Sequence, residues 1–224
     1  MIRLVVFDCD GTLVDGQYAI IEAMRRSFLR HRLAPPPAAA VRRVVGLALP
    51  SAIARLWPDG DNGVCEGLVR DYRTEFATLR SDPAHREPLY PGAAKAIAGL
   101  AAAGYRLGMA TGKSRRGLRA TLERCGLYDR FVTLQTADDA PSKPHPGMLE
   151  RAMSEAGVAV DETAHVGDTT FDVEMAINAG VAALGVSWGY HEAEELAAAG
   201  AHAVIDSFAE LPGVLASLAG APRG

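Results

Sequence analysis

The chain has 224 residues, 49% of them hydrophobic, which is enough for one large domain or for a core with a smaller insert. A formal net charge of −4 argues against a general nucleic-acid binder, because such proteins carry a basic face. No apolar run is long enough for a membrane span or a signal peptide, and three widely spaced cysteines predict neither a disulfide framework nor a zinc site, so we expect a cytoplasmic protein with no membrane partner.

Short apolar runs typical of buried strands alternate with helical patterns along most of the chain. Strands are expected at residues 3–7, 106–110, 131–134, 164–166, 182–186 and 203–205. Helices are expected at residues 93–103, 114–125, 146–156, 170–179 and 192–199, each followed by a glycine that can end it. This alternation predicts an α/β fold in which helices flank a Rossmann-like parallel sheet.

Residues 16–88 break the alternation. Their patterns predict helices at residues 18–31, 37–45, 49–56 and 65–80, separated by proline-rich and glycine-rich breaks. An all-helical block after the first strand of an α/β core predicts an inserted cap domain. We therefore expect residues 1–15 and 89–224 to form the α/β core and residues 16–88 to form the helical cap.

Polar clusters follow several of the predicted strands, at the edge where open parallel sheets bind ligands. Asp8 and Asp10 directly follow the first strand, with Gly11 allowing a tight turn. One carboxylate could attack an electrophilic phosphorus while the other gives and takes a proton. A solvated Asp-Gly turn is the alternative. Asp168 and Asp172 could hold a hard cation such as Mg²⁺, or they could only cap and stabilise the start of a helix.

Two further clusters are candidates for phosphate binding. Thr111 and Gly112 lie between a predicted strand and a predicted helix, where a hydroxyl and free backbone N–H groups can cradle a phosphate. A threonine or serine helix cap is the alternative there. Lys143 is fixed next to Pro144, where it could neutralise a phosphate or restrain a carboxylate, or it could belong to an ordinary surface loop.

Taken together, these residues resemble the four ordered motifs of the haloacid dehalogenase superfamily of phosphotransferases. The motifs are residues 8–12, Thr111, Lys143 and residues 167–172, and the resemblance covers essentially the whole chain, including the insert. It is nearest to phosphoglycolate phosphatase-like enzymes, on the grounds of the helical insert, residues 89–92, residues 143–146 and the helix around residues 175–180.

The resemblance implies a role for each matching residue. Asp8 would be the nucleophile that becomes an aspartyl phosphate, and Asp10 the general acid and base, with both contributing to the Mg²⁺ site. Asp168 would be a metal ligand, and Asp172 either a ligand through water or a partner of Lys143. The phosphoryl group would be bound by Thr111, Gly112 and Lys143.

The implied function is a Mg²⁺-dependent phosphatase acting on a small phosphorylated metabolite, with phosphoglycolate as the first substrate to consider. The family's dehalogenases lack the second aspartate, which is present here as Asp10. Its phosphonatases use a Schiff-base lysine in the cap, but no lysine precedes Lys95. A phosphosugar mutase and a non-catalytic binding or regulatory protein stay open as alternatives, and either a monomer or a homodimer is compatible with the sequence.

Several other polar residues have two interpretations. Arg43 and Gly46, followed by Leu47, could contact substrate from the cap, or they could simply end a helix. Lys113, Arg115 and Arg116 could steer an anionic substrate or form a solvated helix face. We expect His145 to be a loop residue, His165 to finish a strand, and Trp57 and Trp188 to be packing residues.

Overall fold

The computed structural model describes residues 1–82 and 84–218, and its centre is one six-stranded sheet in which every neighbouring pair is parallel. The strand order is β3-β2-β1-β4-β5-β6. The strands are β1 (Leu4–Phe7), β2 (Arg106–Thr111), β3 (Thr133–Thr136), β4 (Thr163–Gly167), β5 (Ala182–Val186) and β6 (Ala203–Ile205). The chain starts in the middle and winds outward both ways, which confirms the predicted Rossmann-like α/β fold.

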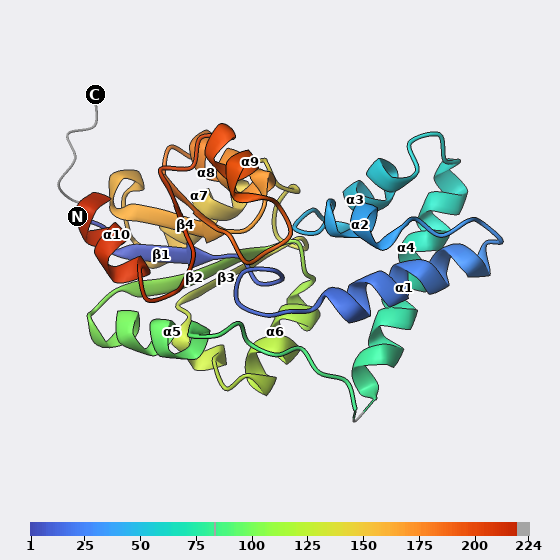
Figure 1. Cartoon of the computed structure of the whole chain (residues 1–224), viewed down its shortest axis with the longest axis horizontal. Helices are drawn as coiled ribbons and strands as arrows, with labels where there is room; N and C mark the ends of the chain where they lie inside the picture. The colour runs from blue at the N-terminus through green and yellow to red at the C-terminus, as the bar shows by residue number, and fades with distance from the viewer. Residues whose placement is uncertain (83, 219–224) are drawn as a thin grey trace.

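Helices cover both faces of the sheet (Figure 1). They are α5 (Ala93–Ala102), α6 (Arg115–Arg124), α7 (Gly147–Ala156), α8 (Thr170–Asn178), α9 (Ala193–Ala198) and α10 (Leu211–Leu218). One apolar cluster joins the sheet to α5, α6 and α10, and a second joins it to α7, α8 and α9. All four residues of β1 are buried, as expected for a central strand covered on both faces.

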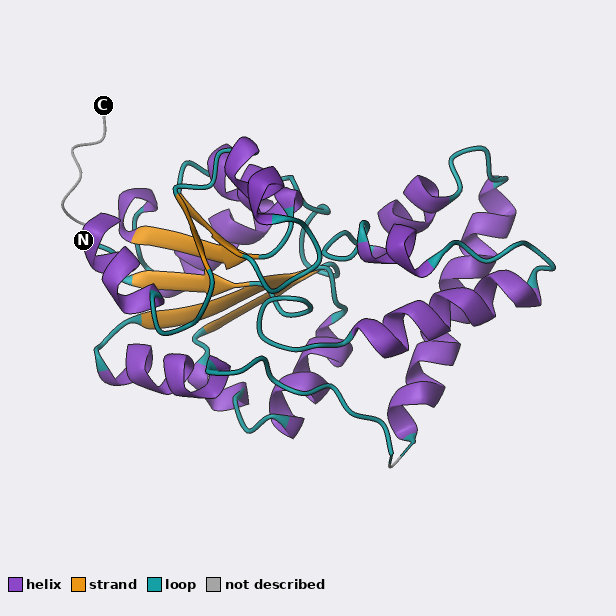
Figure 2. Ribbon diagram, in the orientation of Figure 1, coloured by secondary structure: helices purple, strands orange, loops and turns teal. Residues whose placement is uncertain are grey.

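A lobe of four helices lies between β1 and α5, and we call it the helical insert. It consists of α1 (Gln17–Arg30), α2 (Ala38–Arg42), α3 (Leu49–Leu56) and α4 (Asn62–Ser81). Figures 1 and 2 show it beyond the edge at which the strands end, and it has its own apolar cluster, which includes Met24, Phe28 and Ile53. The helical insert therefore faces the end of the sheet where ligands bind.

Three expectations from the sequence differ from the structure. The helix expected at residues 37–45 ends at Arg42, because the chain then tightens into successive turns such as Val45 N–H to Arg42 carbonyl, and reverses at Gly46, whose φ is +95°. β3 begins at Thr133, two residues late, after a 3₁₀ turn at Tyr128–Arg130. Helix α10 was not anticipated.

Candidate active site

Asp8 and Asp168 lie side by side because their strands are neighbours. Phe7 at the end of β1 pairs with Val166 of β4, and the Asp8 backbone N–H donates to the Val166 carbonyl at 2.9 Å. Asp168 is oriented by Thr12 Oγ1, which donates to its Oδ1 at 2.8 Å, and by the Tyr190 N–H, which donates to its Oδ2 at 2.9 Å. The two carboxylates are thus fixed by the sheet and its loops.

Asp8, Asp168 and Asp172 form a buried acidic cluster whose candidate ligand oxygens all lie within 4.8 Å of one another. Burial raises the pKa of Asp8 to about 7, and burial together with the Asp172 and Asp8 charges raises the pKa of Asp168 well above its usual value. Asp8 Oδ2 is buried and accepts no hydrogen bond from any described residue. With an unused Asp8 oxygen and mutually repelling charges, the carboxylates of Asp8 and Asp168 fit a hard divalent cation.

Lys143 supplies positive charge to this cluster from a fully buried position. Its Nζ donates to Asp172 Oδ1 at 2.6 Å and lies 3.1 Å from Asp8 Oδ1. The two carboxylates outweigh the effect of burial and raise the pKa of Lys143, while Lys143 and His165 overcome burial and hold the pKa of Asp172 well below its usual range. The side chain is therefore a permanent cation beside Asp8, which removes the surface-loop alternative.

Both oxygens of Asp172 are occupied by other side chains. Its Oδ1 contacts Lys143 Nζ and His165 Nε2, the latter at 2.9 Å, and its Oδ2 accepts from Thr169 Oγ1 at 2.6 Å. Thr169 and Asp172 also form the capping box that starts α8. His165 was expected only to finish a strand, although a buried histidine in an apolar strand was a signal that it has a partner.

Asp10 is paired with Lys113, a contact that the sequence did not predict. The two side chains are 2.9 Å apart between Oδ2 and Nζ, and both are largely buried. Burial raises the pKa of Asp10, while the Lys113 charge partly opposes that shift. Lys113 Nζ also lies 5.5 Å from the centre of the Phe76 ring on α4, so this cation bridges the core and the helical insert.

The Thr111 hydroxyl is not used as a helix cap. Ser114 caps α6 by accepting from the Gly117 N–H, whereas Thr111 Oγ1 at the end of β2 accepts only a long bond of 3.3 Å from the Lys113 N–H. The helix start, the Thr111 hydroxyl and the Gly112 backbone therefore lie together at the sheet edge, next to Asp10 and Asp8.

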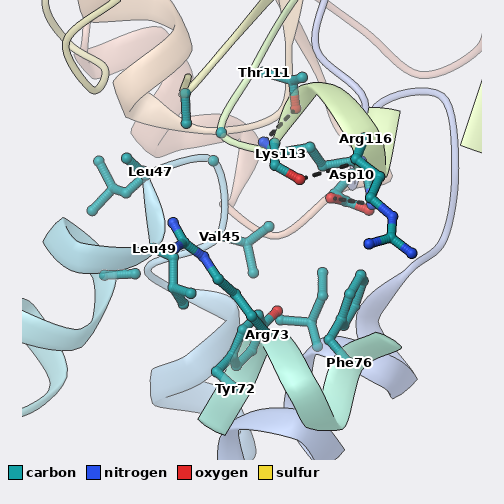
Figure 3. A pocket seen from close by; sticks show the side chains of 18 of the residues that line it. Asp10, Val45, Leu47, Leu49, Tyr72, Arg73, Phe76, Thr111, Lys113 and Arg116 are labelled. Atoms are coloured by element: carbon teal, nitrogen blue, oxygen red, sulfur yellow. Dashed lines mark hydrogen bonds and ion pairs between the residues drawn. The ribbon is translucent and has the colours of Figure 1, made fainter. Parts of the chain in front are cut away.

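The helical insert closes over these residues and leaves a cavity of about 590 Å³ between the two lobes (Figure 3). Gly112 touches the insert so closely that a Cβ there would lie 2.5 Å from the Leu47 carbonyl oxygen. On the other side of the cavity, Arg80 of α4 donates to the Gly117 carbonyl and to Thr121 Oγ1, each at 3.1 Å. The cavity has Asp8 and Asp10 at its core end.

The two residues proposed for substrate contact from the insert differ in position. Gly46 lines the cavity, together with Leu47. Arg43 does not; its guanidinium forms a two-bond pair with Glu195, at 2.6 and 2.7 Å. Of the basic residues after Thr111, Arg115 pairs with Asp139 at 2.5 Å, whereas Arg116 lines the cavity.

The remaining side chains have structural surroundings. His145 Nδ1 accepts from the Gly147 N–H at 3.0 Å within its loop, and Trp57 packs edge-on against Phe28. Trp188 packs against Phe208 and donates to the Thr12 carbonyl at 3.1 Å. No helix among the described residues combines the length and the hydrophobicity that a membrane crossing requires.

A family model described as haloacid dehalogenase-like hydrolase matches residues 2–180. The chain belongs to this family. It is 37% identical over 220 residues to "Probable phosphatase IndB" of Dickeya dadantii, covering 96% of this chain and 94% of the relative. It is 35% identical over 220 residues to the phosphoglycolate phosphatase of Rhodospirillum rubrum, covering 94% and 90%. These relatives place the haloacid dehalogenase-like chain among the family's phosphatases, in a phosphoglycolate phosphatase-like subgroup.

Solved structures share the fold of this chain. A predicted phosphatase from Clostridium acetobutylicum superimposes with a TM-score of 0.86 at 23% identity, covering 97% of this chain and 99% of that one. A predicted phosphoglycolate phosphatase from Haemophilus somnus gives a TM-score of 0.84 at 22% identity, covering 95% and 97%. The agreement extends through the helical insert as well as the α/β core.

Proposed function

We propose that this protein is a Mg²⁺-dependent phosphomonoester hydrolase that works through an aspartyl phosphate on Asp8. The observation that carries the proposal is the surroundings of Asp8, a buried carboxylate between the Lys143 ammonium and Asp168 at the core end of the cavity between the two lobes. Asp10 lies two residues further along the same loop and lines the same cavity. A nucleophile, a proton carrier and compensating positive charge are thus in one place.

Asp8, Asp168 and the backbone carbonyl of Asp10 would hold the magnesium ion, which when bound supplies positive charge beside the phosphoryl oxygens. Asp172 is not a magnesium ligand in this proposal. Because the Lys143 ammonium lies 2.6 Å from its Oδ1, Asp172 positions this cation rather than taking a ligand place of its own. Lys143, Thr111 and the Gly112 N–H would bind the oxygens of the transferring phosphoryl group.

The reaction has two balanced steps. In the first, an Asp8 carboxylate oxygen bonds to phosphorus while the bond from phosphorus to the leaving alcohol breaks, and protonated Asp10 gives its proton to the leaving oxygen. In the second, the Asp10 carboxylate takes a proton from water as the water oxygen bonds to phosphorus. The bond from phosphorus to Asp8 then breaks, which releases phosphate and restores both aspartates.

The helical insert would act as the cap that keeps bulk water away during the first step. Its contacts on both sides of the cavity, through Gly46 and Leu47 and through Arg80, support this role. We propose residues 16–88 as the cap and residues 1–15 and 89–224 as the catalytic core.

The test is phosphate release from a panel of small phosphomonoesters with Mg²⁺ or with EDTA. Phosphoglycolate belongs in the panel because relatives carry its name. We expect Mg²⁺-dependent release by the wild-type protein and none by Asp8→Asn. Interconversion of phosphosugars without phosphate release would indicate a mutase instead, and no turnover of any substrate would indicate a binding protein.

A further inference from the structure

The cavity above Asp8 is much larger than the substrate after which the relatives are named. At about 590 Å³ it is in the range that encloses ligands of roughly drug size. Phosphoglycolate has only two carbons between its phosphoryl oxygen and the end of its carboxylate. With its phosphoryl group beside Asp8, it would leave most of this volume unfilled.

The walls of the cavity are mainly apolar. One wall comes from the turns and helix that follow α2, and the opposite wall from α4 (Figure 3). Apolar or aromatic side chains on these walls are Val45, Leu47, Leu49, Tyr72 and Phe76. A carboxylate held against these five side chains would lose hydration without gaining a charged partner, which is costly. The walls instead suit an uncharged ring or branched hydrocarbon.

Arg73 places one cation on the α4 wall of this cavity. It lies on the same face of α4 as Phe76, three residues on, and as Arg80, seven residues on. Arg80 reaches α6 of the core, and the backbone of Arg73 lies about 10 Å from that of Arg80 along the helix axis. Figure 3 shows its side chain extending toward Leu49 and Leu47.

Arg73 is also available for a ligand. It forms no ion pair and no hydrogen bond with any described residue, whereas the candidate from the sequence, Arg43, is taken by Glu195. The planar guanidinium is suited to binding a carboxylate with two parallel bonds. The acidic residues that line the cavity, Asp8, Asp10 and Asp138, form no ion pair with Arg73.

Building on the proposed phosphatase function, we propose that the cavity selects phosphomonoesters whose alcohol has an apolar body of about ring size and a carboxylate at its far end, which Arg73 binds. The chemical class is therefore a phosphorylated aromatic or branched carboxylic acid rather than a two-carbon acid. Arg73 is the specificity-determining residue.

Three primary-alcohol phosphates test this selection with matched leaving-group chemistry: phosphoglycolate, benzyl phosphate and para-carboxybenzyl phosphate. We expect kcat/KM to rise in that order, by about tenfold from benzyl to para-carboxybenzyl phosphate, since a charge-assisted pair is worth about that much. Highest activity on phosphoglycolate would overturn the proposal and leave the phosphatase function intact.

Variants on α4 assign the effect to Arg73. Arg73→Met should abolish the tenfold preference for the carboxylated benzyl phosphate over benzyl phosphate, while the control Arg70→Met, an exposed arginine outside the cavity, should keep it. Equal losses on all three substrates in Arg73→Met would show that Arg73 serves the phosphoryl group, against the proposal. Ala77→Phe, which adds bulk to the wall, should shift the preference toward phosphoglycolate.

Binding of non-hydrolysable phosphonates separates the two proposals. Calorimetry should give the phosphonoethyl analogue of para-carboxybenzyl phosphate at least about tenfold higher affinity than phosphonopropionate, with the difference lost in Arg73→Met. This result without any phosphate release would overturn the hydrolase function but support the selectivity. Equal affinities, or tighter phosphonopropionate binding, would overturn the selectivity.

Discussion

Lys143 is the buried residue on which the charge balance of the site depends most. It is the only described cation within ion-pair distance of Asp8, and it also contacts Asp172. Removing one partner of a buried ion pair leaves the others uncompensated, which costs about 3–5 kcal/mol. The same charge is needed beside an anionic phosphoryl group.

We therefore expect Lys143→Met to lose activity by about a hundredfold or more and to unfold at a lower urea concentration. Lys95→Met is the matched control because Lys95 is exposed on α5. Phosphate-release assays and urea titration followed by circular dichroism measure the two effects. Unchanged turnover in Lys143→Met would contradict the role proposed for this residue.

Protonation of Asp8 predicts how pH affects the metal-free protein. Its folded-state pKa is raised to about 7, whereas an unfolded aspartate titrates near about 3.9. Between those values the folded chain keeps a proton that the unfolded chain has lost, so this group lowers stability as pH rises from about 4 to 7. The pKa of Asp168 is also raised, so this group likewise lowers the stability of the fold as pH rises.

A bound cation should offset this loss of folding stability at higher pH, because carboxylates bind metals in their deprotonated form. We expect Mg²⁺ to raise the melting temperature more at pH 7.5 than at pH 5.5, as recorded by thermal-shift assays in one buffer ionic strength. In Asp8→Asn the difference between the Mg²⁺ effects on melting temperature at the two pH values should be smaller. An equal Mg²⁺ effect at both pH values in the wild-type protein would contradict a carboxylate metal site with a raised pKa.

The residues of the site differ in how well the sequence predicts them. The sequence places Asp8 and Asp168 together because carboxyl ends of parallel strands meet at one edge, and no side-chain geometry is needed for that. The pairing of Lys113 with Asp10 depends on a fold-back of the loop after β2 and on Phe76 from another lobe. No local sequence pattern contains that information, so the sequence alone leaves Lys113 either to steer an anionic substrate or to lie on a solvated helix face.

At the scale of elements, the contact between the loop after β2 and the helical insert limits how far the two lobes close. A Cβ on Gly112 would lie 2.5 Å from the Leu47 carbonyl oxygen and 2.6 Å from that of Gly46, and backbone atoms cannot yield as a flexible side chain can. The insert would have to move away from the core to admit a methyl group.

We expect Gly112→Ala to lower kcat/KM by about tenfold or more and to increase the radius of gyration in solution scattering, because closure is blocked. Gly99→Ala serves as the control, since nothing lies within 4 Å of a Cβ placed there. A Gly112→Ala protein with unaltered scattering and activity would show that the closed contact is not needed.

The sequence predicts the ends of helices correctly where a residue at the boundary itself, such as a glycine or a proline, marks the end. α3 begins and ends at the expected residues, and α7 ends at Ala156 before the left-handed Gly157. α2 is shorter than its apolar pattern suggests because Gly46 must reverse the chain toward the core. That reversal allows the two lobes to pack together, and the apolar periodicity of a helix contains no information about such contacts.

At the scale of the whole molecule, two lobes enclose one cavity and each supplies part of its wall. The parallel α/β sheet and the helical insert followed from the alternation of patterns and its interruption after residue 15, but the strand order did not. The width of the cavity and the pairing of Arg43 with Glu195 did not, because both arise from how the insert is set against the core. The substrate selection that we propose thus depends on contacts between the lobes, which the sequence predicts least well.

The proposed mechanism depends most on transfer of the phosphoryl group to Asp8. Its most direct test is mass spectrometry of the Asp8-containing peptide after acid quenching of the enzyme during turnover. We predict a phosphorylated peptide with Mg²⁺, absent with EDTA and absent in Asp8→Asn, which should also release no phosphate. Full Mg²⁺-dependent phosphate release by Asp8→Asn, with no phosphorylated peptide, would contradict the account.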